Sequence, residues 1–132
     1  MDVIFVKDLK TDHIRRDFTV NAMYMDEHFQ LYDFENGLED LNNRTLKMVG
    51  SPLKRLKEDP LRIIRCLRFS ITYGLSIDKK LDEAIYKSIK YLENISKDKI
   101  KMELKKFDMR QKSDIVLIFE KYCVKHLLDV IE

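Results

Sequence analysis

The feature that most constrains this chain is a helical repeat of apolar residues that fills its second half, from residue 51 onward. Apolar side chains recur there every three or four positions, in the groups Leu61–Ile71, Leu81–Leu92, Ile100–Phe107 and Ile115–Val130. A spacing near 3.6 predicts amphipathic helices, each burying one face. Gly74 is placed to end the first helix, and Ser96 to cap the third.

The first 50 residues follow a different pattern. Val3–Val6 is a short β-branched and aromatic run that predicts a strand. Phe18–Met25 and Phe29–Phe34 flank the polar residues Asp26–His28, which predicts a β-hairpin. Gly37 follows, at a position expected to be left-handed or in close approach to other backbone. We therefore expect an α+β fold, a short hairpin followed by a mostly α-helical part.

Composition excludes several classes of protein. Three glycines and two prolines in 132 residues leave few turns, which argues against a many-stranded fold. A net charge of +2 by itself indicates no nucleic-acid partner. The two cysteines, Cys66 and Cys123, are isolated, and the histidines are scattered, so we expect no metal site in this chain. With neither an 18-residue apolar run nor a signal-peptide pattern, a cytoplasmic or organellar-matrix protein, not secreted, is expected, with no membrane partner.

A basic and acidic cluster precedes the first predicted strand. Arg15, Arg16, Asp17 and Asn21 lie within seven residues of each other. Arginine presents a planar fork of donors that suits phosphate oxygens, and an aspartate or asparagine can hold a ribose hydroxyl. The alternative is a solvated run of charges that ends in a strand, and spacing alone favours that alternative.

A second charged pattern opens the helix predicted at Leu61. Asp59 and Arg62 would lie about 60° apart on a helical wheel, so both could point to one target. Arg65 and Arg68 continue the same spacing. The alternative is a well-capped helix with Asp59 as N-cap and Pro60 in the first turn, which leaves the three arginines unexplained.

A carboxylate beside a guanidinium can select among nucleobases. Cytosine and adenine both present an exocyclic amine beside an unprotonated ring nitrogen, so the acid accepts from the amine while the arginine donates to the ring. Uracil and guanine would set a carbonyl oxygen against the carboxylate and leave polar groups unpaired, at roughly 1–3 kcal/mol each. Such a pair could choose C and A without an RNA template, provided that it faces a pocket.

Taken in order, these segments resemble the class II tRNA nucleotidyltransferases and their relatives, the bacterial poly(A) polymerases. The family's RRDxxxN motif, which handles ribose and triphosphate, is similar to RRDFTVNAMYMD. Its glycine-containing hinge is similar to DFENGLEDL, and its EDxxRxxR motif to KEDPLRIIRCLRF. The helix that supports the family's site is similar to SKDKIKMELKKF. The resemblance runs from Val6 to Phe107, and four motifs in the right order make it specific.

The resemblance implies roles for individual residues. The first motif implies that ribose and triphosphate are bound by Arg15, Arg16, Asp17 and Asn21. Asp59 and Arg62 would form the template for CTP and ATP, Arg65 would assist with phosphates, and Arg68 completes the nucleotide-binding set. Gly37 matches the hinge glycine. The resemblance also implies a head at 1–46, a helical neck at 47–95 and the start of a body at 96–132.

One departure from the family limits what this chain is expected to do alone. The family opens with a glycine-rich GGxVRD-type turn and a DxD pair that holds magnesium, yet no glycine precedes Gly37 and no DxD occurs. No catalytic residue is therefore expected here, and the magnesium ligands would lie outside this chain, on an upstream segment or a second chain. The resemblance implies a nucleotidyltransferase adding C and A to tRNA; poly(A) synthesis and a non-catalytic RNA- or nucleotide-binding remnant stay open.

Overall fold

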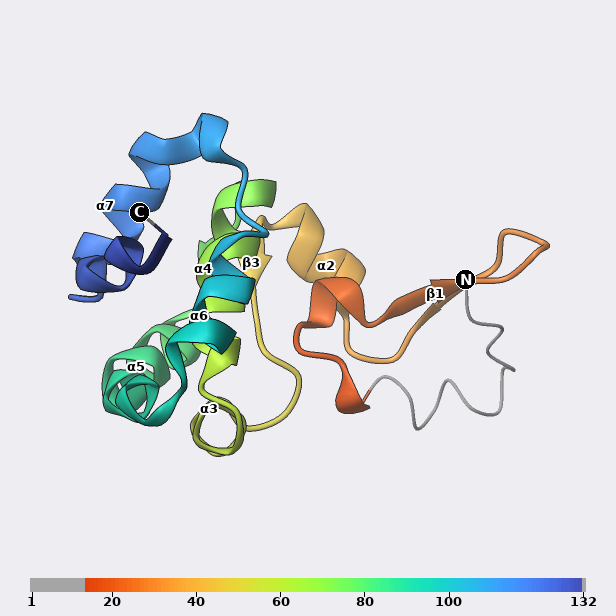
Figure 1. Cartoon of the computed structure of the whole chain (residues 1–132). Coiled ribbons are helices and arrows are strands. Elements are labelled where there is room, and N and C mark those ends of the chain that lie inside the picture. Colours follow the sequence, from red (N-terminus) through yellow and green to blue (C-terminus); the bar gives the residue numbers. More distant parts are fainter. Residues whose placement is uncertain (1–13, 132) are drawn as a thin grey trace.

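The computed structural model describes residues 14–131 and has an α+β fold, as predicted. A two-stranded hairpin extends from a body of short helices, and the two regions meet at α2 (Figure 1). The strand predicted at Val3–Val6 lies outside the described residues. Within residues 14–131, no helix is both long enough and apolar enough to cross a membrane.

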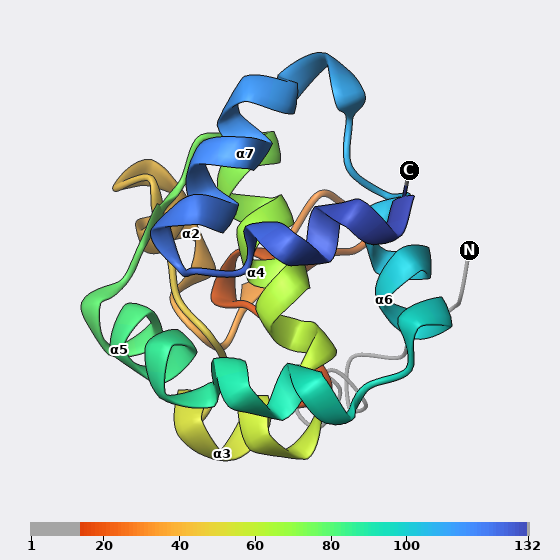
Figure 2. The ribbon, with the colours of Figure 1, turned by 60° about the vertical axis from the view of Figure 1, so that its left-hand side comes forward.

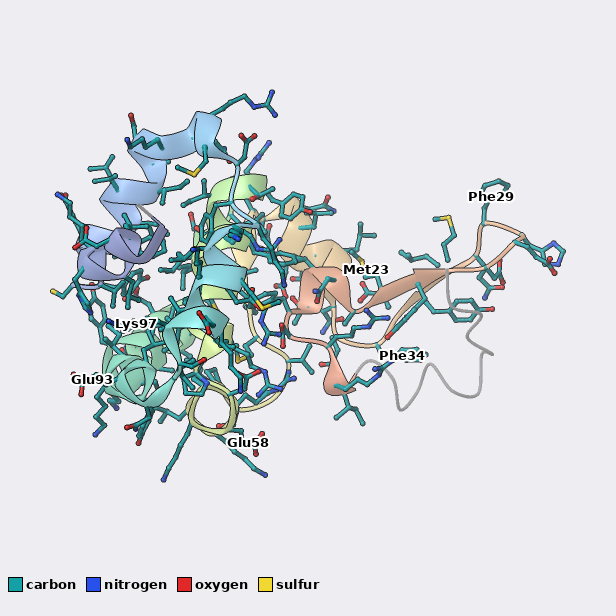
Figure 3. All side chains as sticks on the ribbon, viewed as in Figure 1. Met23, Phe29, Phe34, Glu58, Glu93 and Lys97 are labelled. Carbon is teal, nitrogen blue, oxygen red and sulfur yellow. The ribbon has the colours of Figure 1, made fainter. Side chains whose placement is uncertain are left out.

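The hairpin is shorter than the sequence predicts. β1 (Met23–Met25) pairs antiparallel with β2 (Leu31–Asp33), and the Asp26 carboxylate orders the turn by accepting from the N–H groups of His28 and Gln30. Phe29, at the far end of the hairpin (Figure 3), is 81% exposed.

The prediction of a strand over Phe18–Met25 is wrong for its first half. Thr19–Asn21 forms a 3-10 turn, η1, because Asn21 Oδ1 accepts from the Phe18 N–H at 3.0 Å and closes the chain on itself. Phe18 is fully buried and makes an isolated antiparallel bridge with Met48. The polar side chain therefore overrides the alternating pattern.

Gly37 begins the short helix α2 (Gly37–Asn42) and lies in close approach, one of the two roles predicted for it. A Cβ on Gly37 would stand 2.2 Å from the Thr19 carbonyl oxygen. The left-handed residue is its neighbour Asn36, with φ 58°. The Asp33 carboxylate accepts from the N–H groups of Gly37 and Leu38 and so fixes the start of α2 against the hairpin.

The remaining elements surround α4 (Leu61–Tyr73), as Figure 2 shows. This helix buries Ile63, Ile64, Cys66 and Leu67. The strand β3 (Thr45–Leu46) pairs in parallel with β4 (Ser76–Ile77). The other helices are α3 (Pro52–Glu58), α5 (Lys79–Ser88), α6 (Lys97–Leu104) and α7 (Lys112–Lys121). Short 3-10 segments are η2 (Ile89–Asn94), η3 (Met109–Gln111) and η4 (Lys125–Ile131).

Two predicted helix boundaries are confirmed. Gly74 ends α4 with φ 62°, a left-handed conformation that glycine adopts without steric cost. Ser96 opens α6, and its hydroxyl oxygen accepts from the Lys99 N–H at 3.3 Å. Phe107 lies beyond the end of α6 but is still buried in the core.

The single helix predicted over Ile115–Val130 is wrong, because the chain breaks after α7. Cys123 has φ 60°, which a continuous helix does not allow, and η4 then begins at Lys125. The break lets Tyr122 and Val124 both turn into the core. The hydroxyl of Tyr122 donates to Asp82 of α5. An apolar run alone does not reveal such a break.

Candidate functional site

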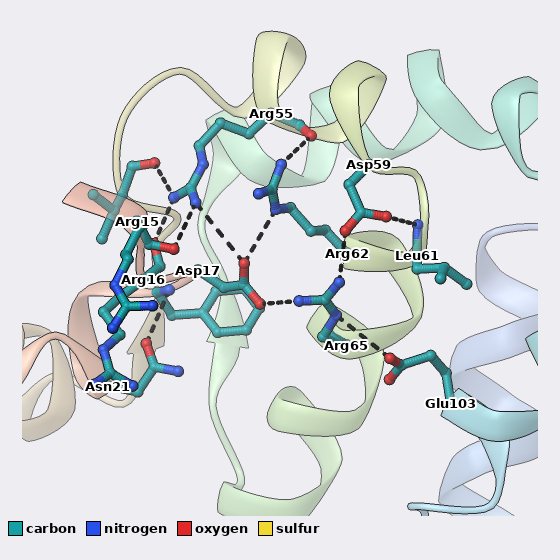
Figure 4. Close-up of polar contacts among 12 residues, drawn as sticks. Arg15, Arg16, Asp17, Asn21, Arg55, Asp59, Leu61, Arg62, Arg65 and Glu103 are labelled. Carbon is teal, nitrogen blue, oxygen red and sulfur yellow. Dashed lines mark hydrogen bonds and ion pairs between the residues drawn. The ribbon is translucent and has the colours of Figure 1, made fainter. Parts of the chain in front are cut away.

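Asp17 joins the segment before the hairpin to the central helix α4 (Figure 4). Its Oδ1 accepts from Arg62 Nε at 3.1 Å, and its Oδ2 accepts from Arg65 Nη1 at 2.7 Å. The Asp17 side chain is 14% exposed, so water screens these ion pairs little. Arg62 and Arg65 follow Asp17 by 45 and 48 residues, so two motifs that are distant in the sequence meet at one carboxylate.

Arg65 bridges three acids that come from three parts of the chain. Besides Asp17, its Nη2 donates to Asp59 Oδ2 at 2.7 Å, and its Nε lies 3.8 Å from Oε1 of Glu103 in α6. Burial works to lower the pKa of this guanidinium, but the Asp17, Asp59 and Glu103 carboxylates outweigh burial and raise the pKa. Arg65 is therefore the point at which the cluster is held together.

Asp59 lies between α3 and α4, not on the helix itself, so an angle taken from a helical wheel does not describe it. Its Oδ1 accepts from the Leu61 N–H at 3.2 Å, while its Oδ2 binds Arg65. The carboxylate thus helps to cap α4 and belongs to the charged cluster at the same time. Its side chain is 37% exposed and open to solvent.

Arg62 is directed toward Asp17 in this structure. Its Nε binds that carboxylate, and its Nη1 donates to the backbone carbonyl of Arg55 at 2.8 Å. The predicted partners Asp59 and Arg62 thus lie in one cluster, yet each is paired with another residue. Arg62 is bound to Asp17, and Asp59 is bound to Arg65.

The other predicted site residues border this cluster. The Arg16 guanidinium lies over the Tyr24 ring, 5.7 Å from its centre, and Arg15 is exposed. Asn21 uses its side-chain oxygen within its own turn. Arg68 lies over the Phe69 ring at 5.4 Å, and its buried Nε has no hydrogen-bond partner among the described residues.

Two residues of the cluster were not predicted from the sequence. Arg55 in α3 reaches three backbone carbonyls beside Asp17, and Glu103 in α6 faces Arg65. Glu103 did carry a signal in the sequence, since it follows Ile100 by about one turn and so lies on the apolar face of its helix. In the structure Glu103 is 9% exposed. Arg55 carried none, because its partners are main-chain atoms distant in sequence.

The donor set in the described residues does not suit a metal ion. Residues 14–131 contain no group of three His, Cys, Asp or Glu side chains that could hold one. Asp17, the most central acid, already accepts from two guanidiniums and has a third 3.9 Å away, so its charge is neutralised.

Sequence comparison agrees with the geometry. Residues 2–47 match the family model described as the Poly A polymerase head domain. A CCA-adding enzyme of Staphylococcus epidermidis is 44% identical over 108 residues, and one of Lactococcus lactis subsp. lactis is 40% identical over 130 residues. The chain belongs to the family of tRNA nucleotidyltransferases and poly(A) polymerases.

Solved structures of this family share the fold. The Bacillus stearothermophilus CCA-adding enzyme, solved in complex with CTP, superposes over 76% of the chain with a TM-score of 0.70 and 37% identity. A tRNA-processing enzyme solved with CTP superposes over 93% with a TM-score of 0.77 and 28% identity. The chain spans 27% and 33% of the two curated relatives and 25% and 34% of these two structures.

Proposed function

We propose that this chain is the nucleotide-selecting and RNA-contacting part of a tRNA nucleotidyltransferase, which adds C and A residues to tRNA 3′ ends from CTP and ATP. The observation that carries the proposal is the contact of Asp17 with Arg62 and Arg65, because it unites two motifs of a nucleotide site. The relatives named CCA-adding enzymes, one of them solved with CTP, support the same function.

Base selection falls to Asp59 and Arg62 in this proposal. The Asp59 carboxylate is accessible and can accept from the exocyclic amine of cytosine or adenine. Arg62 donates to the adjacent ring nitrogen after it exchanges Asp17 for the base. The two residues are already held in one cluster, so the exchange needs side-chain rotation but no refolding of α4.

Phosphate and ribose contacts fall to the segment that precedes the hairpin. Arg15 and Arg16 supply forked donors for the triphosphate, while Asp17 and Asn21 offer oxygens to a ribose hydroxyl. Arg65 and Arg68 lie one and two turns further along α4 and add positive charge toward the phosphates. Gly37 is the proposed hinge residue between head and neck.

Phosphoryl transfer needs groups beyond those of the cluster. Magnesium supplies charge neutralisation at the transferring phosphate in such reactions, but the described acids do not form a site for it. We therefore assign nucleotide binding and selection to the described residues of this chain. The catalytic aspartates would come from an upstream segment or from a second chain.

The proposed domain organisation agrees with these proposed roles. Residues 1–46 form the end of a nucleotidyltransferase head, 47–95 a neck with the selecting helix, and 96–132 the start of a body. The tRNA is the proposed partner, and the cytoplasm or an organellar matrix the proposed location. Poly(A) synthesis is the second candidate, favoured by the description of the matching family model.

A chimera tests the proposed function directly. The segment of the S. epidermidis enzyme that aligns with this chain, 108 residues, is replaced by the matching residues of this chain. We expect the chimera to add C and A to tRNA that lacks its 3′ end, with the unmodified enzyme as reference. The isolated chain should incorporate nothing. A chimera that adds only long A tracts would favour poly(A) synthesis, and a folded but inactive chimera would favour a non-catalytic module.

A further inference from the structure

Arg55 is a nearly buried arginine whose donors serve main-chain oxygens. Its side chain is 11% exposed, and its Nη1 donates to the carbonyls of Arg16 and Val49 at 2.5 and 2.8 Å. Its Nη2 donates to the carbonyl of Arg15 at 3.2 Å (Figure 4). The Asp17 carboxylate is farther away, at 3.9 Å. Burial and the adjacent Arg62 guanidinium lower the pKa of Arg55.

These hydrogen bonds continue a backbone pairing between two segments. The Thr19 N–H donates to Lys47 O, and the Val49 N–H donates to Asp17 O, each at 3.0 Å. Arg55 extends this pairing, because its guanidinium donates to the carbonyl oxygens of Arg16 and Arg15.

The main chain of Arg55 contacts the selecting helix. Its carbonyl oxygen accepts from Arg62 Nη1 at 2.8 Å. One residue therefore contacts the segment assigned to phosphates through its side chain, and the residue assigned to the base through its backbone. These two contacts can be separated experimentally, because a substitution removes the first and leaves the second.

We propose that Arg55 is a positioning residue that fixes the Arg15–Asp17 backbone for triphosphate binding, an inference that rests on the proposed nucleotide-binding function. Lysine at this position keeps the charge and three donors, but all three leave from one nitrogen atom, so it does not reproduce the planar fork that reaches the three carbonyls through two nitrogens. The backbone of Arg15 and Arg16 would then be less ordered, and their guanidiniums would be held less firmly in place. Base selection would be unaffected, because Asp59, Arg62 and the carbonyl of residue 55 all remain.

The test compares Arg55→Lys with Arg110→Lys, the same change at a side chain that is 91% exposed. Binding of inorganic tripolyphosphate, CTP and UTP to the full chain is measured by calorimetry below the unfolding transition of every variant. We expect Arg55→Lys to weaken tripolyphosphate and CTP binding by roughly tenfold, with an unchanged ratio of CTP to UTP affinity. Arg110→Lys should match the original chain.

Amide hydrogen exchange provides a second readout that needs no nucleotide. The Thr19 and Val49 amides should exchange faster in Arg55→Lys, whereas the amides of α5 keep their protection. Unchanged protection would overturn the structural half of the proposal. Unchanged tripolyphosphate affinity in a folded Arg55→Lys chain would overturn the positioning role alone. An original chain that binds neither CTP nor tripolyphosphate would instead refute the proposed function.

Discussion

Arg65 and Asp17 are 48 residues apart, yet Arg65 Nη1 donates to Asp17 Oδ2 at 2.7 Å in a partly buried ion pair. The same arginine reaches Asp59 and Glu103, so one side chain ties the pre-hairpin segment, the start of α4 and α6 together. Removing one partner of such a pair leaves the other charge uncompensated, so we expect this contact to contribute to the free energy of unfolding.

Neutralising Asp17 should destabilise the fold. In Asp17→Asn the amide keeps the shape but removes the negative charge that balances Arg62 and Arg65, and we expect a loss of about 2 kcal/mol in the free energy of unfolding. Urea titration measures the change. Glu93→Gln, at an exposed side chain of η2, is the control and should cost less than about 0.5 kcal/mol. Equal effects of the two changes would contradict the role given to Asp17.

Adding a single methyl group at Gly37 should be more damaging than at Gly74. In Gly37→Ala the new Cβ meets the Thr19 carbonyl oxygen at 2.2 Å and the Met23 side chain at 2.9 Å, so backbone must shift. We expect a loss of roughly 2–4 kcal/mol. At Gly74 the nearest atom is 3.9 Å away, and only the left-handed φ of 62° opposes alanine, at about 1 kcal/mol. Thermal or urea unfolding ranks the two, and the reverse order would refute the close approach.

Tyr122 should make stability fall at high pH. Burial first, and then the hydrogen bond to Asp82, raise the pKa of this phenol above its ordinary value, so the folded state keeps the proton where the unfolded state loses it. The stabilisation is complete below about pH 10 and is lost as the pH rises further. Between about pH 8 and pH 11, the free energy of unfolding should fall more in the original chain than in Tyr122→Phe. Parallel declines would show that Tyr122 does not contribute.

The sequence predicts those parts of the fold that depend on local pattern. The apolar spacing of α4, its end at Gly74 and the cap at Ser96 are all determined within one or two helical turns. The turn at Thr19–Asn21 and the break at Cys123 were missed, since one depends on an asparagine side chain and the other on where Tyr122 is buried. Neither leaves a signal in hydrophobic periodicity.

The site was predicted as a set of residues but not as a geometry. In the structure Asp17, Arg62 and Arg65 lie in one cluster, whereas the nucleotide-binding roles that the motifs imply for them remain predictions. Which acid pairs with which arginine depends on how α4 packs against the segment before the hairpin, and that is a long-range property of the fold. The role of Arg55 could not be predicted for the same reason, because its partners are main-chain carbonyl oxygens that any residue could supply.

The proposed function depends most on Asp59 and Arg62 acting together on a base, and equilibrium binding of the four nucleoside triphosphates measures that directly. The original chain should bind CTP and ATP at least about tenfold more tightly than UTP and GTP, because the wrong bases leave polar groups unpaired. Asp59→Asn and Arg62→Lys should each reduce that preference, whereas the exposed control Arg110→Lys should retain it. Equal affinity for all four nucleotides, or a preference unchanged in both variants, would contradict base selection by Asp59 and Arg62.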